Sequence, residues 1–99
     1  MRFYLAAVLL VLPLPAAADP VAHGAALVKS NCASCHAVTE DDASPNPRAI
    51  PFRFLGRLYP IEHLDAALAE GIMVSHEMPE FEPDQVNALI LYLESIQVR

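Results

Sequence analysis

Both cysteines of the chain and one of its four histidines lie within five residues, in the stretch CASCH (residues 32–36). Cysteines this close together serve three kinds of chemistry: a redox disulfide, a zinc site, or the covalent attachment of haem. A structural disulfide between Cys32 and Cys35 would close a very short loop and would restrict the unfolded chain very little. The rest of the sequence must decide among these chemistries, because each needs a different scaffold around the cysteines.

A redox dithiol of the thioredoxin type needs its two cysteines at the start of a helix that follows a strand. The segment before Cys32 lacks the alternating pattern of a strand, and no convincing strand pattern occurs elsewhere in the sequence. The sequence therefore disfavours a thioredoxin-like enzyme.

A zinc site needs four ligands in a tetrahedron, and the two cysteines would supply two of them. The other ligands would have to be histidines outside the motif, namely His23, His63 or His76. No second pair of ligands at close spacing is present, so these residues are scattered along the chain. Zinc stays an alternative, but it leaves His36 without a role.

The N-terminus has the pattern of a secretory signal peptide. Arg2 precedes an apolar run without charges (residues 3–14), and the small residues Ala16 and Ala18 stand just before a suitable cleavage point. We therefore predict a cleaved signal peptide over residues 1–18.

A retained membrane anchor is the alternative for this segment. The apolar stretch is about 16 residues long and contains two prolines, whereas a spanning helix needs roughly 20 residues. Cleavage would leave one domain, residues 19–99, with no membrane span and with a periplasmic location.

This domain is small and acidic. Its 81 residues bury too little surface to be comfortably stable without a disulfide framework, a metal or a cofactor. It contains five basic and twelve acidic residues, a net charge of about −7 with histidine neutral. Such a surface argues against nucleic-acid binding and favours basic protein partners.

Helical periodicity and helix-ending residues predict an all-α fold. Gly71 is a good stop signal for one helix, and Pro83 suits the first position of another. A short helical turn is also expected within residues 52–59, after an acidic, proline-rich loop at residues 39–51. The three expected helices cover residues 21–36, 62–70 and 83–97.

Haem attachment explains every position of the motif. On a helix, positions i, i+3 and i+4 share one face, so Cys32, Cys35 and His36 would all point at the same object. The two thiols would form thioether bonds with haem, and His36 would then reach the iron. The C-x-x-C-H pattern is the signature of c-type haem attachment, and a secreted, helical, cofactor-needing domain is the context it requires.

The sequence resembles the class I monohaem cytochromes c, and in particular the small bacterial ones. GAALVKSNCASCH (residues 24–36) is similar to the first helix of that family, and MPEFEPDQVNALILYLESI (residues 78–96) to its distal-ligand loop and last helix. The resemblance covers nearly the whole of residues 19–99. It implies that the two helices cross closely, with Gly24 against Tyr92.

The resemblance also implies the second iron ligand. In the family this ligand is a methionine, usually followed by proline, and Met78 with Pro79 matches that pattern. Met73 and His76 are the alternative ligands. Met73 has apolar neighbours in the sequence, so we expect it to pack in the core, and His76 has polar neighbours, so we expect it to be exposed.

The proximal histidine needs its other ring nitrogen held, commonly by a backbone carbonyl. In the family this acceptor is a proline in the loop after the motif. Pro51 is the best match for His36, and Pro45 and Pro47 are alternatives. The chain departs from mitochondrial relatives in having a single lysine, Lys29, so their docking rules do not transfer.

The resemblance implies a function. With His36 and Met78 on the iron, no substrate can coordinate it, and the protein is expected to be a monomeric, non-enzymatic, one-electron carrier between redox partner proteins. The alternative is a haem c subunit or partner of a periplasmic dehydrogenase or oxidase complex. The residues expected to line the haem pocket are Leu27, Val28, Phe52, Leu55, Leu64, Leu68, Phe81, Leu89 and Leu93.

Overall fold

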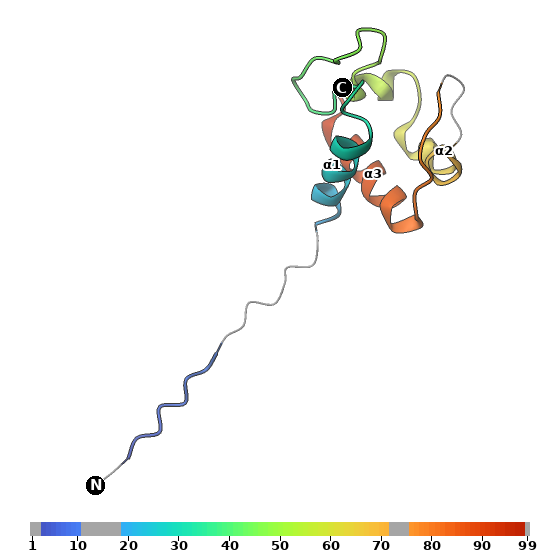
Figure 1. Cartoon of the computed structure of the whole chain (residues 1–99). Coiled ribbons are helices and arrows are strands. Elements are labelled where there is room, and N and C mark those ends of the chain that lie inside the picture. The colour runs from blue at the N-terminus through green and yellow to red at the C-terminus, as the bar shows by residue number, and fades with distance from the viewer. Residues whose placement is uncertain (1–2, 11–18, 72–75, 99) are drawn as a thin grey trace.

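The fold is built from helices alone within the residues that the structure, a computed structural model, describes: 3–10, 19–71 and 76–98 (Figure 1). No strand occurs in these ranges, so the expected all-α class is confirmed. The elements in chain order are α1 (Pro20–Asn31), the 3-10 helices η1 (Phe52–Arg57) and η2 (Ile61–Leu64), α2 (Asp65–Glu70) and α3 (Pro83–Ile96).

Helix α1 begins where the sequence indicated but ends earlier. The Asp19 carboxylate accepts a hydrogen bond from the N–H of Val21, which caps the first turn. We expected the helix to continue to His36, whereas its last residue is Asn31. The Asn31 side chain donates to a carbonyl one turn back in the helix. Side-chain bonds of this kind compete with continued helix formation.

Helix α2 is preceded by the 3-10 turn η2, so the expected helix over residues 62–70 is present in two parts. Its end is set by Gly71, whose φ of 67° lies in the left-handed region. A side chain at this position would be strained by φ and would also approach the Met78 carbonyl oxygen at 2.9 Å. Gly71 therefore both ends α2 and lets the segment around Met78 pass close to it.

Helix α3 matches its expected bounds closely, from Pro83 to Ile96. Pro83 occupies the first turn, where its missing N–H costs nothing. The Gln85 side chain accepts a hydrogen bond from the N–H of Glu82, 2.9 Å away, and so caps the start of the helix.

The closest crossing in the fold joins α1 and α3, which Figure 1 shows passing over one another. Gly24 lies buried at the crossing, and a Cβ atom there would be 2.1 Å from the Ala88 carbonyl oxygen and 2.6 Å from the Tyr92 Cβ. Only glycine leaves room for the two backbones at this distance. The expected pairing of Gly24 with Tyr92 is therefore confirmed.

One apolar core connects the helices. The nine residues expected to line the haem pocket all belong to this core or pack against it. The C-terminus closes one side of the core, because the Gln97 side chain donates to the Phe52 carbonyl and accepts from the Gly56 N–H, each at 2.7 Å.

Most of the expected signal peptide lies outside the described residues, at 1–2 and 11–18. Residues 3–10 form no helix or strand, and their large apolar side chains are exposed. Within the described ranges, no helix combines the length and the apolar character needed to cross a bilayer.

Candidate functional site

The CASCH motif lies in consecutive turns directly after α1. The Cys32 N–H still bonds to the Val28 carbonyl at 2.8 Å, and the His36 N–H bonds to the Cys32 carbonyl at 2.9 Å. One helical turn thus continues through the motif although the regular helix has ended. The i, i+4 relation between Cys32 and His36 is kept.

The two cysteines are free thiols in different surroundings. Cys32 is half-buried and packs against the core, whereas Cys35 is exposed. Burial raises the pKa of the Cys32 thiol to about 11, so this sulfur is uncharged at neutral pH before any attachment.

Zinc finds no support in the described part of the chain. There, no three side chains of the types that bind metals (histidine, cysteine or carboxylate) come together. A haem needs fewer protein ligands, namely two thioether bonds and one or two axial groups.

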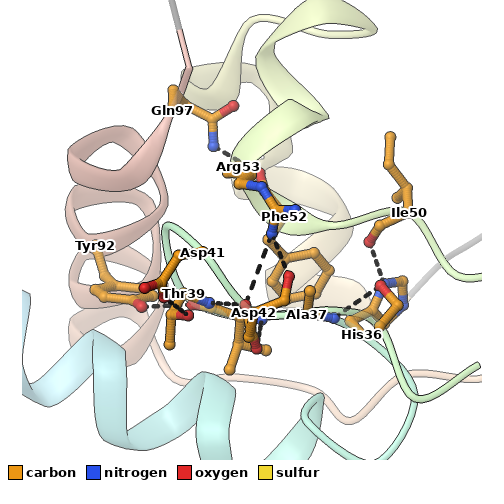
Figure 2. A network of polar contacts seen from close by, with 12 residues as sticks. His36, Ala37, Thr39, Asp41, Asp42, Ile50, Phe52, Arg53, Tyr92 and Gln97 are labelled. Atoms are coloured by element: carbon orange, nitrogen blue, oxygen red, sulfur yellow. Dashed lines mark hydrogen bonds and ion pairs between the residues drawn. The ribbon is translucent and has the colours of Figure 1, made fainter.

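The ring of His36 is held in the way that a metal-bound histidine requires. Its Nδ1 donates to the Ile50 carbonyl oxygen at 2.7 Å (Figure 2). This bond fixes the tautomer and leaves the Nε2 lone pair free for a metal. His36 therefore fits the proximal side of a haem.

The acceptor of this bond differs from our expectation. We predicted Pro51, with Pro45 and Pro47 as alternatives, but the acceptor is Ile50. The physical reason is that the Pro51 carbonyl accepts from the Phe54 N–H at 3.0 Å, as η1 begins. The preceding carbonyl, that of Ile50, is the one that meets His36.

Phe52 fixes the His36 ring from a second side. The two ring centroids are 4.4 Å apart, with an angle of 31° between the planes. The Phe52 N–H also donates to the Ala37 carbonyl at 2.9 Å, next to the motif. The imidazole is thus oriented by a hydrogen bond at its nitrogen and by an aromatic ring on its face.

The loop after the motif folds around the carboxylate of Asp42. Its two oxygens accept from the N–H groups of Val38 and Thr39 at 3.0 and 2.9 Å (Figure 2). Desolvation acts to raise the pKa of Asp42, but the hydrogen bonds from Val38 and Thr39 outweigh it and lower this pKa. Asp42 therefore stays ionised and keeps the loop closed.

Arg53 connects this loop to η1. Its Nη1 donates to the Asp42 backbone carbonyl at 2.6 Å and lies 3.7 Å from the Asp42 carboxylate. From the other side, the Tyr92 hydroxyl donates to the Val38 carbonyl, which joins the loop to α3. Desolvation, with the negative charges of Asp42 and Glu40 nearby, raises the pKa of Tyr92, so its hydroxyl keeps its proton. The first part of the loop that supplies the Ile50 carbonyl is thus joined both to η1 and to α3.

The candidate distal ligand comes from the segment between α2 and α3. Met78 is half-buried and packs against the apolar core. The segment lies beside α2, because the Phe81 N–H bonds to the Leu68 carbonyl at 3.1 Å (Figure 1). Met73, its rival, lies outside the described residues.

His76 precedes Met78 on the same segment and is exposed, as expected. Its ring centroid is 6.1 Å from that of His36, with an interplanar angle of 50°. The structure therefore brings one expected rival of Met78 close to His36.

Sequence reasoning missed the Ile50 carbonyl, the Phe52 ring on His36, and the pairing of Asp42 with Arg53. The first is a backbone group that any residue carries, so no residue type could have indicated it. The second has a weak signal, since an aromatic residue directly follows the proline assigned to the acceptor. The third depends on a loop path that the acidic, proline-rich composition does not specify.

One comparison with known proteins gave a match. The family model described as cytochrome C oxidase, cbb3-type, subunit III matches residues 19–93, which is more than half of the chain. Comparisons with curated proteins and with solved structures gave no significant match.

Proposed function

This chain belongs to the cytochrome c family described as cytochrome C oxidase, cbb3-type, subunit III, and from that premise we propose that it is a small one-electron carrier of the periplasm. Membership brings with it a haem-based electron-transfer role and a covalently bound haem c. Our proposal adds the residues: Cys32 and Cys35 form the two thioethers, His36 is the proximal ligand and Met78 the distal one.

The hydrogen bond from His36 Nδ1 to the Ile50 carbonyl is the observation that carries this proposal. It leaves Nε2 free on a ring that Phe52 also orients. A histidine whose outer nitrogen is held by a backbone carbonyl is the usual arrangement of a metal ligand. It is found here directly after the two cysteines that would tether the porphyrin.

When bound, haem c supplies a one-electron couple between Fe(II) and Fe(III). His36 and Met78 would occupy both axial positions, so that no substrate reaches the iron. A methionine–histidine pair raises the reduction potential, and the apolar core, including Phe52 and Leu68, excludes water and raises it further. These residues suit electron transfer without bond-making, which is the reason to propose a carrier.

A second candidate is a haem c subunit or partner of a periplasmic dehydrogenase or oxidase complex. The description of the matching family, an oxidase subunit, favours it. So do two adjacent apolar residues with large exposed fractions, Leu58 at 61% and Tyr59 at 50%. Haem-stained native electrophoresis of a periplasmic extract separates the candidates, since a carrier migrates alone and a subunit with its complex.

We expect the purified protein to keep its haem after denaturation. Mass spectrometry should give the mass of residues 19–99 plus one haem, because thioether bonds survive unfolding and the proposed signal peptide is cleaved before Asp19. Expression needs a host with a haem-attachment system. Release of free haem on denaturation would contradict the proposed linkage, and a mass that includes residues 1–18 would contradict cleavage.

Replacing Met78 by alanine should remove the sulfur–iron charge-transfer band of the ferric protein and lower its reduction potential. The reason is that methionine ligation raises the potential relative to nitrogen ligation or an open position. Absorption spectra and redox titration measure both effects. Met73→Ala is the control and should keep the band. If the band disappears in Met73→Ala and persists in Met78→Ala, the ligand is Met73 instead.

A further inference from the structure

The rings of His36 and His76 have the separation of two axial ligands on one metal. An imidazole nitrogen binds a metal at about 2.0 Å, and the ring centre lies ~1.1 Å beyond that nitrogen, so two opposed imidazoles have centroids roughly 6 Å apart. The observed separation is 6.1 Å. The two rings come from different parts of the chain, one after α1 and one before α3.

In both rings Nδ1 is held by a backbone carbonyl, which leaves Nε2 as the nitrogen that can bind a metal. The Nδ1 of His36 donates a hydrogen bond to the Ile50 carbonyl oxygen at 2.7 Å, and the Nδ1 of His76 lies 3.0 Å from the carbonyl oxygen of Glu77. With both Nδ1 atoms as donors, each ring has its Nε2 lone pair available. Neither Nε2 forms a hydrogen bond with another residue of the described ranges. A backbone carbonyl at Nδ1 is the usual partner of a metal-bound histidine, and both rings have one.

His76 and Met78 stand two residues apart on one segment, so about 7 Å of backbone at most separates their Cα atoms. An exchange of one side chain for the other would need a movement of this segment by no more than about that distance. Met78 is the half-buried member and packs against the core, whereas His76 is exposed. The two residues therefore compete for one position, with packing in favour of Met78.

We propose that His76 is a second axial ligand, which takes the position opposite His36 whenever the Met78 sulfur is off the iron. This inference rests on the proposed function, since it assumes the haem at His36. It concerns loss of the sulfur bond by substitution, or by oxidation of the methionine to its sulfoxide with a peroxide, which transfers one oxygen atom to the sulfur and leaves as water or an alcohol. The exchange forms one nitrogen–iron bond in place of one sulfur–iron bond and needs no electron or proton from elsewhere. Its consequence is a site that stays closed to small molecules.

The test uses the haem-loaded, full-length mature protein and added imidazole as the probe. In Met78→Ala, the tethered His76 competes with added imidazole at an effective concentration of about millimolar or more. Imidazole should therefore bind Met78→Ala at least about tenfold more weakly than it binds Met78→Ala/His76→Ala. Ferric Met78→Ala should remain low-spin with two nitrogen ligands by electron paramagnetic resonance, and the double variant should not.

Two further variants complete the design. Met78→Leu keeps the apolar volume of the side chain without a ligand atom, so it replaces Met78→Ala if that variant does not fold. Met78→Ala/His63→Ala removes another exposed histidine, on η2, and should behave like Met78→Ala alone. Equal imidazole affinity in Met78→Ala and Met78→Ala/His76→Ala, repeated in the leucine background, would overturn the proposal.

The wild-type spectrum separates this proposal from the function it rests on. A wild-type protein that lacks the sulfur band and loses its low-spin state in His76→Ala would make His76 the resident ligand. That result supports histidine ligation here while contradicting Met78 in the proposed function. A wild-type protein with the sulfur band, and with imidazole affinities that do not depend on His76, would contradict the exchange and leave the carrier intact.

Discussion

The double variant Cys32→Ala/Cys35→Ala is expected to lose cooperative unfolding altogether. The free energy of unfolding of an ordinary domain is only about 5–15 kcal/mol. An 81-residue domain built around a cofactor is expected to have a smaller free energy of unfolding once that cofactor is lost. Without thioethers the haem would no longer be tethered, and the apolar side chains around it would face a gap. Circular dichroism should show reduced helix content and no sharp thermal transition.

Cys32 is half-buried and packs against the core, so the double variant removes some packing as well as the haem tether. Cys35 is exposed, so its side chain contributes little packing of its own. Ser34→Ala, an exposed change between the two cysteines, is the matched control and should unfold like the wild type. A cooperative transition in the double variant at the wild-type midpoint would show that the fold does not depend on the haem.

Features that depend on one residue type at one position could be predicted from the sequence. Gly71 ends α2 because a left-handed residue is needed there, and Pro83 begins α3 because its ring suits a first turn. The pairing of Gly24 with Tyr92 came from the family resemblance, and its cause is steric. A Cβ at Gly24 would lie 2.1 Å from a backbone oxygen of α3.

Features that depend on the path of the backbone could not be predicted. The early end of α1 coincides with a side-chain bond of Asn31 to the helix, which helical periodicity does not register. The choice of Ile50 over Pro51 follows from the start of η1, which uses the Pro51 carbonyl.

The same limit applies to the site. The sequence indicated that His76 would be exposed, and it is, but exposure does not exclude closeness to His36. Its ring lies 6.1 Å from that of His36 because the segment before α3 returns beside α2. That return depends on long-range contacts, such as the Phe81 hydrogen bond to Leu68, between residues that are 13 positions apart in the sequence.

The second large effect is expected for Gly24→Ala, which should destabilise the protein although it improves helix propensity. In an isolated helix, alanine is more favourable than glycine by about 1 kcal/mol. Here the added Cβ would be 2.1 Å from the Ala88 carbonyl oxygen and 2.6 Å from the Tyr92 Cβ, so α1 and α3 must move apart. Overpacking of a core costs roughly 1–3 kcal/mol and occasionally more, and this clash involves backbone that cannot turn aside.

Gly56→Ala is the matched control for this prediction. Its Cβ would lie 2.9 Å from the Gln97 Oε1, the end of a side chain that can shift at the cost of its hydrogen bond from the Gly56 N–H, worth about 1 kcal/mol. We therefore expect the free energy of unfolding, measured in urea by haem absorbance, to fall by at least about 3 kcal/mol in Gly24→Ala and by about 1 kcal/mol in Gly56→Ala. Equal losses in the two variants would mean that α1 and α3 separate at little cost. In that case close contact would not govern position 24, and the crossing would not be what holds the CASCH turn against the core.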